Sequence, residues 1–191
     1  MLEILSPVRL LGLPGSLRKA SFSRATLIGL RDNLPEKVTL EIHEPQLPLY
    51  NEDDDRSNGP EQVLEFRDAI KNSDGIVIVT PEYNHGVPGV LKNALDWASR
   101  PFGHSVLAKK PALAISVSPA FTGGVRAHAQ LNETLLAIPA LVAGGPQVVI
   151  GNIGEKVADG ALVDQSSLHF ALTAVRQMIS MCRLSSSRLI A

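Results

Sequence analysis

GIVIVTPEYNHGVPG, residues 75–89, is the stretch of sequence that decides the fold. Its first six residues are uncharged and mostly β-branched, which predicts a short buried strand over residues 75–80. A loop follows over residues 81–87, and Pro88 is suited to the first turn of a helix that reaches Ser99. A strand that leads through a short loop into a helix is the repeating unit of α/β proteins.

The same order of strand and helix repeats on both sides of this stretch. Further strands are predicted at residues 8–13, 38–43, 111–118 and within 141–150, where Gly144, Gly145 and Pro146 blur the boundary. Further helices are predicted at residues 23–32, 60–72, 125–137 and 165–184. This alternation favours one parallel sheet with right-handed crossovers and helices on both faces. We therefore expect a single α/β domain over residues 1–191, with its ligand site at the carboxyl ends of the strands.

The composition is that of an ordinary globular protein and narrows the classes of partner. Of 191 residues, 45% are hydrophobic and 19% are charged, and the formal net charge is −1. Such a balance gives no reason to expect nucleic acid or an anionic membrane as the main partner. No apolar run is long enough for membrane insertion and no export signal is recognisable, so we expect a cytoplasmic protein. The single cysteine, Cys182, cannot form an intramolecular disulfide, which is compatible with a reducing compartment. The acidic run at residues 52–55 is expected to be a solvated loop.

The loop after the first strand, GLPGSLRKASFSR at residues 12–24, has the character of a phosphate site. Ser16, Ser21 and Ser23 offer hydroxyl donors, and Arg18 offers a charged fork that suits phosphate oxygens. The loop leads into a helix N-terminus, where free N–H groups favour an anion. It contains neither the dinucleotide motif G-x-G-x-x-G nor the nucleotide motif G-x-x-x-x-G-K-[ST], so a terminal monophosphate fits best. The alternative is a plain strand-to-helix turn with Ser23 as the N-cap and Arg18 in solvent.

The second loop, TPEYNHGVPG at residues 80–89, has the character of a site for a flat ring. Tyr83 can pack on a planar ligand, and Asn84 together with the loop N–H groups can bond polar ring edges. Glu82 and His85 either take part in this site or face solvent. The alternative is an ordinary loop that is stiffened by two prolines. That alternative does not explain why an acidic, an aromatic, an amide and an imidazole side chain lie between the prolines.

With these two loops, the chain resembles the NAD(P)H-dependent FMN reductase family, which includes bacterial quinone, chromate and azo-dye reductases. The resemblance rests on GSLRKASFSR at residues 15–24 and on TPEYNHGVPGVLKNALDWASRP at residues 80–101, with looser matches at 116–127 and 150–152. It implies a flavodoxin-like, three-layer fold with a five-stranded parallel sheet in the order 2-1-3-4-5. Two positions depart from the family pattern: Ser23 stands where asparagine is usual, and Pro14 where a small or hydrophobic residue is usual.

The resemblance also implies the residues that hold FMN. Those expected at the FMN phosphate are Ser16, Leu17, Arg18, Ser21, Phe22 and Ser23. Those expected at the isoalloxazine ring are Pro81, Glu82, Tyr83, Asn84, His85 and Ser118. Backbone N–H groups near Tyr83, Asn84 and Ser118 are expected to stabilise negative charge on the reduced ring. No side chain is assigned as a catalytic acid, and His85 is a candidate near the acceptor.

The function implied by the resemblance is a two-step transfer of electrons from NADH or NADPH through FMN to a small acceptor. Quinones, chromate, azo dyes, ferric chelates and flavins are all candidate acceptors, and the sequence does not distinguish NADH from NADPH. Two other classes stay open: a flavodoxin-type electron carrier, against which the near-zero net charge and Arg18 argue, and a flavin-binding module without turnover. Family members are homodimers or homotetramers, so we expect subunit contacts at residues 88–99 and 119–126.

Overall fold

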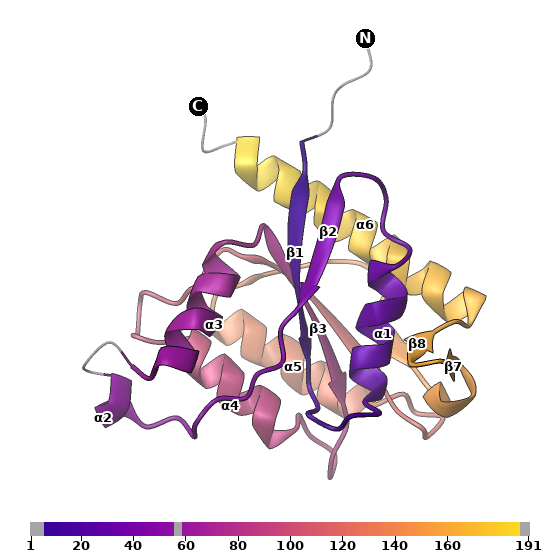
Figure 1. Cartoon of the computed structure of the whole chain (residues 1–191), viewed down its shortest axis with the longest axis horizontal. Coiled ribbons are helices and arrows are strands. Elements are labelled where there is room, and N and C mark those ends of the chain that lie inside the picture. The colour runs from indigo at the N-terminus through magenta and orange to yellow at the C-terminus, as the bar shows by residue number, and fades with distance from the viewer. Residues whose placement is uncertain (1–5, 56–58, 188–191) are drawn as a thin grey trace.

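A parallel β-sheet forms the centre of the computed structural model, which describes residues 6–55 and 59–187 (Figure 1). Its strands follow the order β2-β1-β3-β4-β5, and β6 also pairs with β4. All of these pairs are parallel, which confirms the predicted flavodoxin-like order. The strands are β1 (Val8–Pro14), β2 (Val38–Ile42), β3 (Gly75–Pro81), β4 (Pro111–Val117), β5 (Leu141–Val142) and β6 (Val148–Ile150).

Helices cover both faces of this sheet and create two apolar cores. The helices are α1 (Phe22–Arg31), α2 (Glu52–Asp55), α3 (Glu61–Lys71), α4 (Gly89–Ala98), α5 (Val125–Ala137) and α6 (Gln165–Ser187). Because neighbouring strand residues point to opposite faces, Val77 and Val79 of β3 pack with α1 and α6, whereas Ile76 and Ile78 pack with α3, α4 and α5. The central strand is therefore buried from both sides, as its uncharged sequence predicts.

The fifth strand of the prediction is divided into two short pieces. β5 pairs with β4 at Pro111 and Ala112, and β6 pairs with it at Ile115–Val117. The interruption contains Gly144, Gly145 and Pro146, and Gly145 has a φ of 121°. Since proline cannot donate a ladder hydrogen bond and glycine weakens a strand, these residues break the pairing without moving the chain away from β4.

The expectation of a solvated loop at residues 52–55 is wrong in part. These residues form α2, and the Asp55 carboxylate accepts two hydrogen bonds from Arg67, from Nη1 at 2.8 Å and from Nη2 at 3.1 Å. Arg67 also donates to the carbonyl oxygen of Trp97, so the pair joins α2, α3 and α4. Both charged side chains are only 9% exposed. Asp55 is therefore a buried ion-pair partner, whereas the other acidic residues of the run are exposed to solvent.

A small hairpin on the surface of α1 has no counterpart in the prediction. It consists of β7 (Val157–Ala158) and β8 (Ala161–Leu162) and follows a 3-10 helix at Ile153–Glu155. Asp159 and Gly160 form its turn with φ values of 50° and 77°, as a two-residue hairpin turn requires. β8 lies close to α1 at Gly29, where an added Cβ would lie 2.5 Å from the Leu162 carbonyl oxygen. The hairpin is thus held against the helix that follows the first loop.

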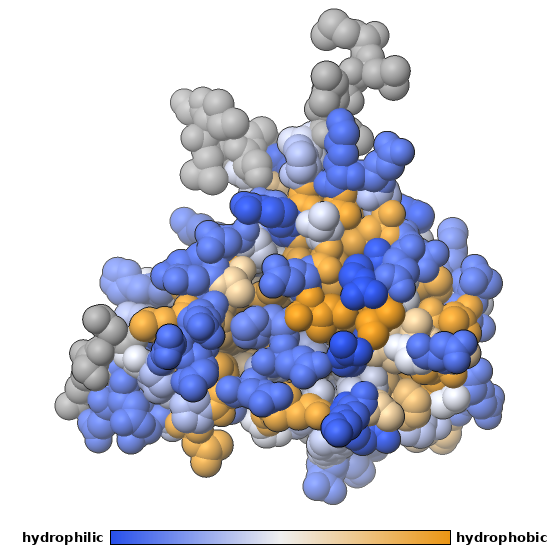
Figure 2. All heavy atoms as spheres, viewed as in Figure 1, coloured by the Kyte–Doolittle hydropathy of each residue, from blue (hydrophilic) through white to orange (hydrophobic). Residues whose placement is uncertain are grey.

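The edge strand β2 lies at the front of the view in Figure 1 and carries exposed Thr39 and Glu41. Figure 2 shows polar side chains over most of this face, interrupted by an apolar area between β2 and α1. A polar edge of this kind discourages pairing with another strand. None of the helices in the described part of the chain combines the length and apolarity needed to cross a bilayer.

Candidate cofactor-binding site

Three loops meet at the carboxyl ends of β1, β3 and β4, at the lower end of the molecule in Figure 1. They enclose a pocket of about 230 Å³ at the point where the strand order reverses between β1 and β3. The residues that line it are Ser16, Arg18, Ser21, Phe22, Ser23, Pro81, Glu82, Tyr83, Val117, Ser118 and Pro119. The structure therefore brings together nine of the twelve predicted site residues, from all three loops. Leu17, Asn84 and His85 lie outside the lining.

The two serines at the start of α1 have separate roles. Ser21 is the N-cap, and its Oγ accepts a hydrogen bond from the Arg24 amide at 3.3 Å. The alternative in which Ser23 caps the helix is therefore wrong. Ser23 is 1% exposed, and its Oγ has no hydrogen-bond partner in the described residues. A buried hydroxyl without a partner costs about 1–3 kcal/mol, so an unpaired donor in the pocket lining indicates a ligand atom.

The first and second loops touch each other directly. The hydroxyl groups of Ser16 and Tyr83 lie 3.3 Å apart, and Ser16 Oγ also accepts a hydrogen bond from the Arg18 amide. The Arg18 guanidinium lies 5.1 Å from the centre of the Phe22 ring, within reach of a cation–π interaction. A cation, two hydroxyl groups and an aromatic ring thus lie together in the pocket lining, next to the helix N-terminus.

The second loop is a two-residue hairpin turn that stands at the rim of the pocket. Tyr83 and Gly86 exchange backbone hydrogen bonds of 3.1 and 3.0 Å, while Asn84 and His85 have φ values of 48° and 68°. Left-handed conformations at two successive residues define a type I′ turn and leave both side chains exposed. The turn explains why Asn84 and His85 do not line the pocket, although Tyr83 does.

Of the three backbone N–H groups expected at the ring, two already donate hydrogen bonds within the protein. The Tyr83 amide donates to the Gly86 carbonyl, and the Ser118 amide donates to the Ile150 carbonyl at 3.0 Å. Both amides are used within the protein, so the expectation that they face a ligand is wrong. No acceptor for the Asn84 amide is found within residues 6–55 and 59–187, and it alone of the three is available. The partner of Ser118 is distant in sequence, and that of Tyr83 depends on the turn that the loop adopts, so the sequence of the loop alone reveals neither.

Glu82 connects the second loop to the third. Its Oε2 accepts hydrogen bonds from the amides of Arg126 and Ala127, at 3.0 and 3.1 Å, in the first turn of α5. That helix begins after Gly124, which has no side chain to cap it, so the carboxylate supplies the cap from another element. Glu82 therefore positions the loops as well as lining the pocket.

Sequence reasoning missed Val117 and Pro119 as lining residues. They flank Ser118 at the end of a predicted strand, and that position was the available signal. With Pro81 and the ring of Tyr83 they add apolar surface to a lining that also contains hydroxyl groups and a cation. In the described ranges, no group of three or more His, Cys, Asp or Glu residues is placed to hold a metal ion.

The lining fits the chemistry of FMN. The Ser23 hydroxyl, which has no partner among the described residues, suits a phosphate together with Arg18 and the helix N-terminus. The apolar surface of the lining suits a tricyclic ring. The pocket volume of about 230 Å³ is below the usual range of roughly 300–1,000 Å³ for ligand sites. A flavin would therefore be gripped at its phosphate and along one side of the ring, and its other side would stay open.

The fold and the pocket together define a flavodoxin-like α/β protein with a site for a phosphorylated planar ligand. The sequence profile described as NADPH-dependent FMN reductase matches residues 8–155, and the chain belongs to this family. It is 37% identical over 172 residues to a quinone reductase of Pseudomonas putida, covering 90% of this chain and 92% of that one. It is 38% identical over 175 residues to a quinone reductase of Escherichia coli, covering 88% and 90%.

A solved structure of similar fold is the flavoenzyme NAD(P)H:(acceptor) oxidoreductase FerB from Paracoccus denitrificans. It superposes with a TM-score of 0.78 at 34% identity, over 92% of this chain and 97% of that one. The likeness extends past the family match, because it includes most of the chain after residue 155.

Proposed function

We propose that this protein is an FMN-dependent oxidoreductase that takes electrons from NADH or NADPH and passes them to a small acceptor such as a quinone. The single observation that carries the proposal is the pocket where three loops meet, in which Ser23 lies with Arg18 and Tyr83 and is buried without a partner among residues 6–55 and 59–187. Membership of the FMN reductase family and the named activities of the relatives support it.

In this proposal the first loop binds the phosphate and the second receives the ring. Ser16, Ser21 and Ser23 with Arg18 act on the phosphate, assisted by the backbone around Leu17 and Phe22. Pro81, Tyr83 and the Asn84 amide lie along the ring, and Glu82 keeps this loop in register with α5. His85 is at the exposed rim, where an acceptor would pass.

When bound, FMN would supply the redox chemistry that connects a reduced nicotinamide with the acceptor. Pro81 and Tyr83 would hold the ring along one side, which would leave the other side accessible to the reductant and the acceptor in turn. The described residues show no nucleophile paired with a base in the pocket lining, and the scheme requires none.

The experiment is to purify the protein, identify its flavin by mass, and follow the absorbance of NADPH or NADH with and without a quinone. Oxidation that depends on both flavin and quinone supports the proposal. FMN binding without oxidation of either coenzyme would instead favour an electron carrier or a flavin-binding module. The net charge of −1 argues against a carrier, because such proteins are strongly acidic where they dock on partners.

The proposed assembly is a homodimer or homotetramer, and the proposed compartment is the cytoplasm. The third loop and the start of α5 expose Phe121 at 85% and Val125 at 43%, which favours a subunit contact beside the open side of the pocket. Cys182 is buried and, as the single cysteine of the chain, forms no intramolecular disulfide, which is compatible with a reducing compartment. Light scattering of the wild type and of Phe121→Ser tests the contact, and an unchanged mass would reject Phe121 as part of it.

A further inference from the structure

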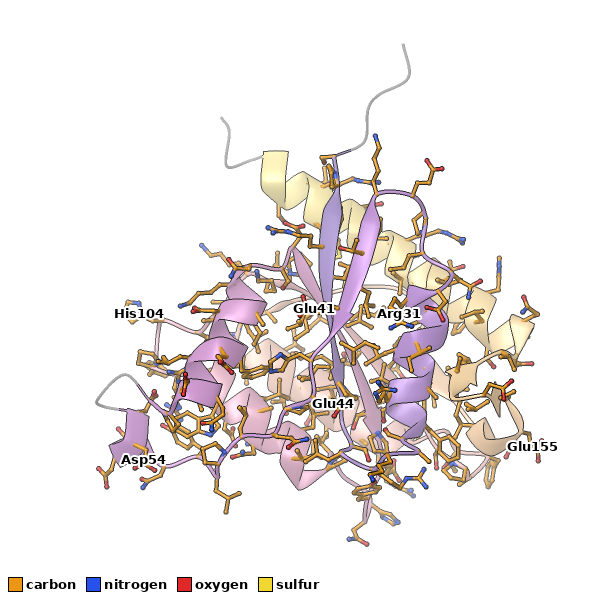
Figure 3. The ribbon with its side chains drawn as sticks, viewed as in Figure 1. Arg31, Glu41, Glu44, Asp54, His104 and Glu155 are labelled. Atoms are coloured by element: carbon orange, nitrogen blue, oxygen red, sulfur yellow. The ribbon has the colours of Figure 1, made fainter. Side chains whose placement is uncertain are left out.

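The third loop, residues 118–124, leads from β4 to α5 and rests on a segment to which the proposed function assigns no role. That segment is residues 150–153, with the sequence IGNI, and it joins the end of β6 to the 3-10 helix at Ile153–Glu155. Figure 3 labels Glu155, the last residue of this helix, at the lower right of the molecule and level with the loops of the candidate site.

Backbone hydrogen bonds attach the third loop to this segment. The parallel pairing of β4 and β6 reaches Ile150, and the contact continues beyond the two strands. The Ser118 amide donates to the Ile150 carbonyl at 3.0 Å, and the Ile153 amide donates to the Ser118 carbonyl at 3.1 Å. The Asn152 amide donates to the Ala120 carbonyl at 3.3 Å. These three bonds fix the first part of the loop relative to the sheet.

Gly151 lies in the middle of this contact, and the space there admits no side chain. An added Cβ would overlap with the carbonyl oxygen of Phe121 and would lie 2.8 Å from its carbonyl carbon. Both atoms belong to the backbone, so rotation of a side chain cannot relieve the overlap and the chain itself has to move. Gly151 does not have a left-handed φ, so the restriction is one of space alone.

The restriction matters because the residues just before Phe121 form part of the wall of the candidate cofactor pocket. Val117, Ser118 and Pro119 line that pocket. The far end of the loop is held as well, since Glu82 of the second loop accepts two hydrogen bonds from the first turn of α5. A displacement of the Phe121 backbone therefore either moves the wall or breaks the hydrogen bonds to residues 150–153 that hold it.

We propose that Gly151 is a positioning residue for the flavin ring. It lets the chain after β6 lie directly against the Phe121 backbone, and so sets the distance between the third loop and the second loop across the site. The inference rests on the proposed function, because the ring is the ligand expected between these two loops. It connects Gly151 with the ring and not with the phosphate, which the first loop would bind.

The test compares Gly151→Ala with Gly144→Ala. Gly144 is a matched control because it lies between β5 and β6, also has no left-handed φ, and an added Cβ there meets no atom within 4 Å. Fluorescence titration uses FMN and riboflavin, which has the ring but no phosphate. Gly151→Ala is expected to raise the Kd of both flavins about fivefold or more, and Gly144→Ala to change either Kd less than about twofold. Arg18→Ala is expected to weaken the binding of FMN and not that of riboflavin.

A second signal separates a displaced wall from a general loss of stability. The visible circular dichroism of bound FMN depends on the surroundings of the ring, and it is expected to change in Gly151→Ala and to stay the same in Gly144→Ala. Titrations are made at a temperature at which far-ultraviolet circular dichroism shows both variants to be folded. A Gly151→Ala protein that binds both flavins like the control, or that weakens FMN and leaves riboflavin unchanged, would overturn the inference.

Hydrogen exchange of the wild type tests the same coupling without a variant, and it decides the matter if Gly151→Ala does not fold. Since coupling between two sites is reciprocal, FMN is expected to slow the exchange of the Asn152 and Ile153 amides, which bond the third loop. Unchanged exchange at both amides on saturation with FMN would also overturn the inference. If the wild type binds FMN with this protection but oxidises neither NADH nor NADPH, the proposed function fails while the role of Gly151 stands.

Discussion

Ser21 and Ser23 are two positions apart at the start of α1, yet their hydroxyl groups meet different needs. The Ser21 hydroxyl is satisfied by the helix that it caps, whereas the Ser23 hydroxyl is buried and has no partner in the part of the chain that the structure describes. Removal of a cap weakens the folded protein itself, but removal of an unpaired hydroxyl removes an unfavourable group. The same chemical change therefore has opposite consequences for the protein without flavin.

We expect Ser21→Ala to lower the free energy of unfolding of the flavin-free protein by about 0.5–2 kcal/mol, the usual cost of a lost cap. We expect Ser23→Ala to leave that free energy unchanged or slightly higher, while the stabilisation gained on adding FMN becomes smaller. Urea denaturation with and without FMN measures both effects. If Ser23→Ala weakens the flavin-free protein as much as Ser21→Ala does, the hydroxyl has a structural partner and the phosphate assignment fails.

Arg18 is exposed beside the pocket and has no carboxylate partner in the described residues. We expect Arg18→Ala to weaken FMN binding by about 1–3 kcal/mol, the range for a lost hydrogen bond to a charged group. Flavin retention during gel filtration and the Kd from fluorescence titration measure the change. Arg31→Ala removes an exposed arginine of α1 at a distance from the pocket and serves as the control. Retention of flavin equal to that of the control would reject the role.

Among the elements, α5 shows how the loops of the site are held in place. The helix begins after a glycine, and the only side chain that caps its first turn in the described structure is Glu82 of the second loop. Glu82 therefore fixes the position of the second loop, which would receive the flavin ring, relative to α5.

We expect Glu82→Ala to lower the free energy of unfolding by about 0.5–2 kcal/mol, because two amides at the N-terminus of α5 lose their acceptor. Glu82→Gln keeps an acceptor oxygen and is expected to lose less. Thermal denaturation of both variants measures this order, and hydrogen exchange of the Arg126 and Ala127 amides locates it. Unchanged exchange at those amides in Glu82→Ala would contradict the capping role.

The elements that sequence patterns predicted well are those decided by local composition. The uncharged strand at residues 75–80 and the amphipathic helices appear within a few residues of the predicted bounds. The short hairpin β7–β8 was not predicted, because two-residue strands have no periodicity and depend on the close contact with Gly29. α2 was not predicted because its stabilising contact is with Arg67, a residue distant in sequence.

For the whole molecule, the parallel strand order explains why the sequence could predict which loops form the site. Once the strand order is known, the three loops must meet at one edge of the sheet, so the lining from Ser16 to Ser118 follows from topology. The topology does not determine the direction in which each backbone amide points. Tyr83 and Ser118 direct theirs to Gly86 and Ile150, and only the folded chain shows these partners.

The folded molecule as a whole also buries histidine, which makes its stability depend on pH. Burial lowers the pKa of His128, whose Nδ1 has no partner in the described residues. Burial also lowers the pKa of His43, against the opposing effect of Glu41 and Glu65. Because the folded pKa lies below the ordinary value of about 6.5, the unfolded chain binds more protons in the interval between the two values. The stability contributed by a neutral, buried imidazole is therefore complete above about pH 6.5 and is lost as the pH falls through the folded pKa.

We expect the free energy of unfolding to decrease from about pH 7 to about pH 5, and His128→Leu to make that decrease shallower. Leucine fills a similar apolar site and cannot take up a proton, so the variant removes one of the two histidine contributions and leaves that of His43. Urea denaturation over this interval measures both slopes. His104→Leu, at an exposed loop position, is the control and is expected to keep the slope of the wild type. Equal slopes in the wild type and His128→Leu would show that protonation of His128 does not limit stability, and that its buried ring is accommodated in both charge states.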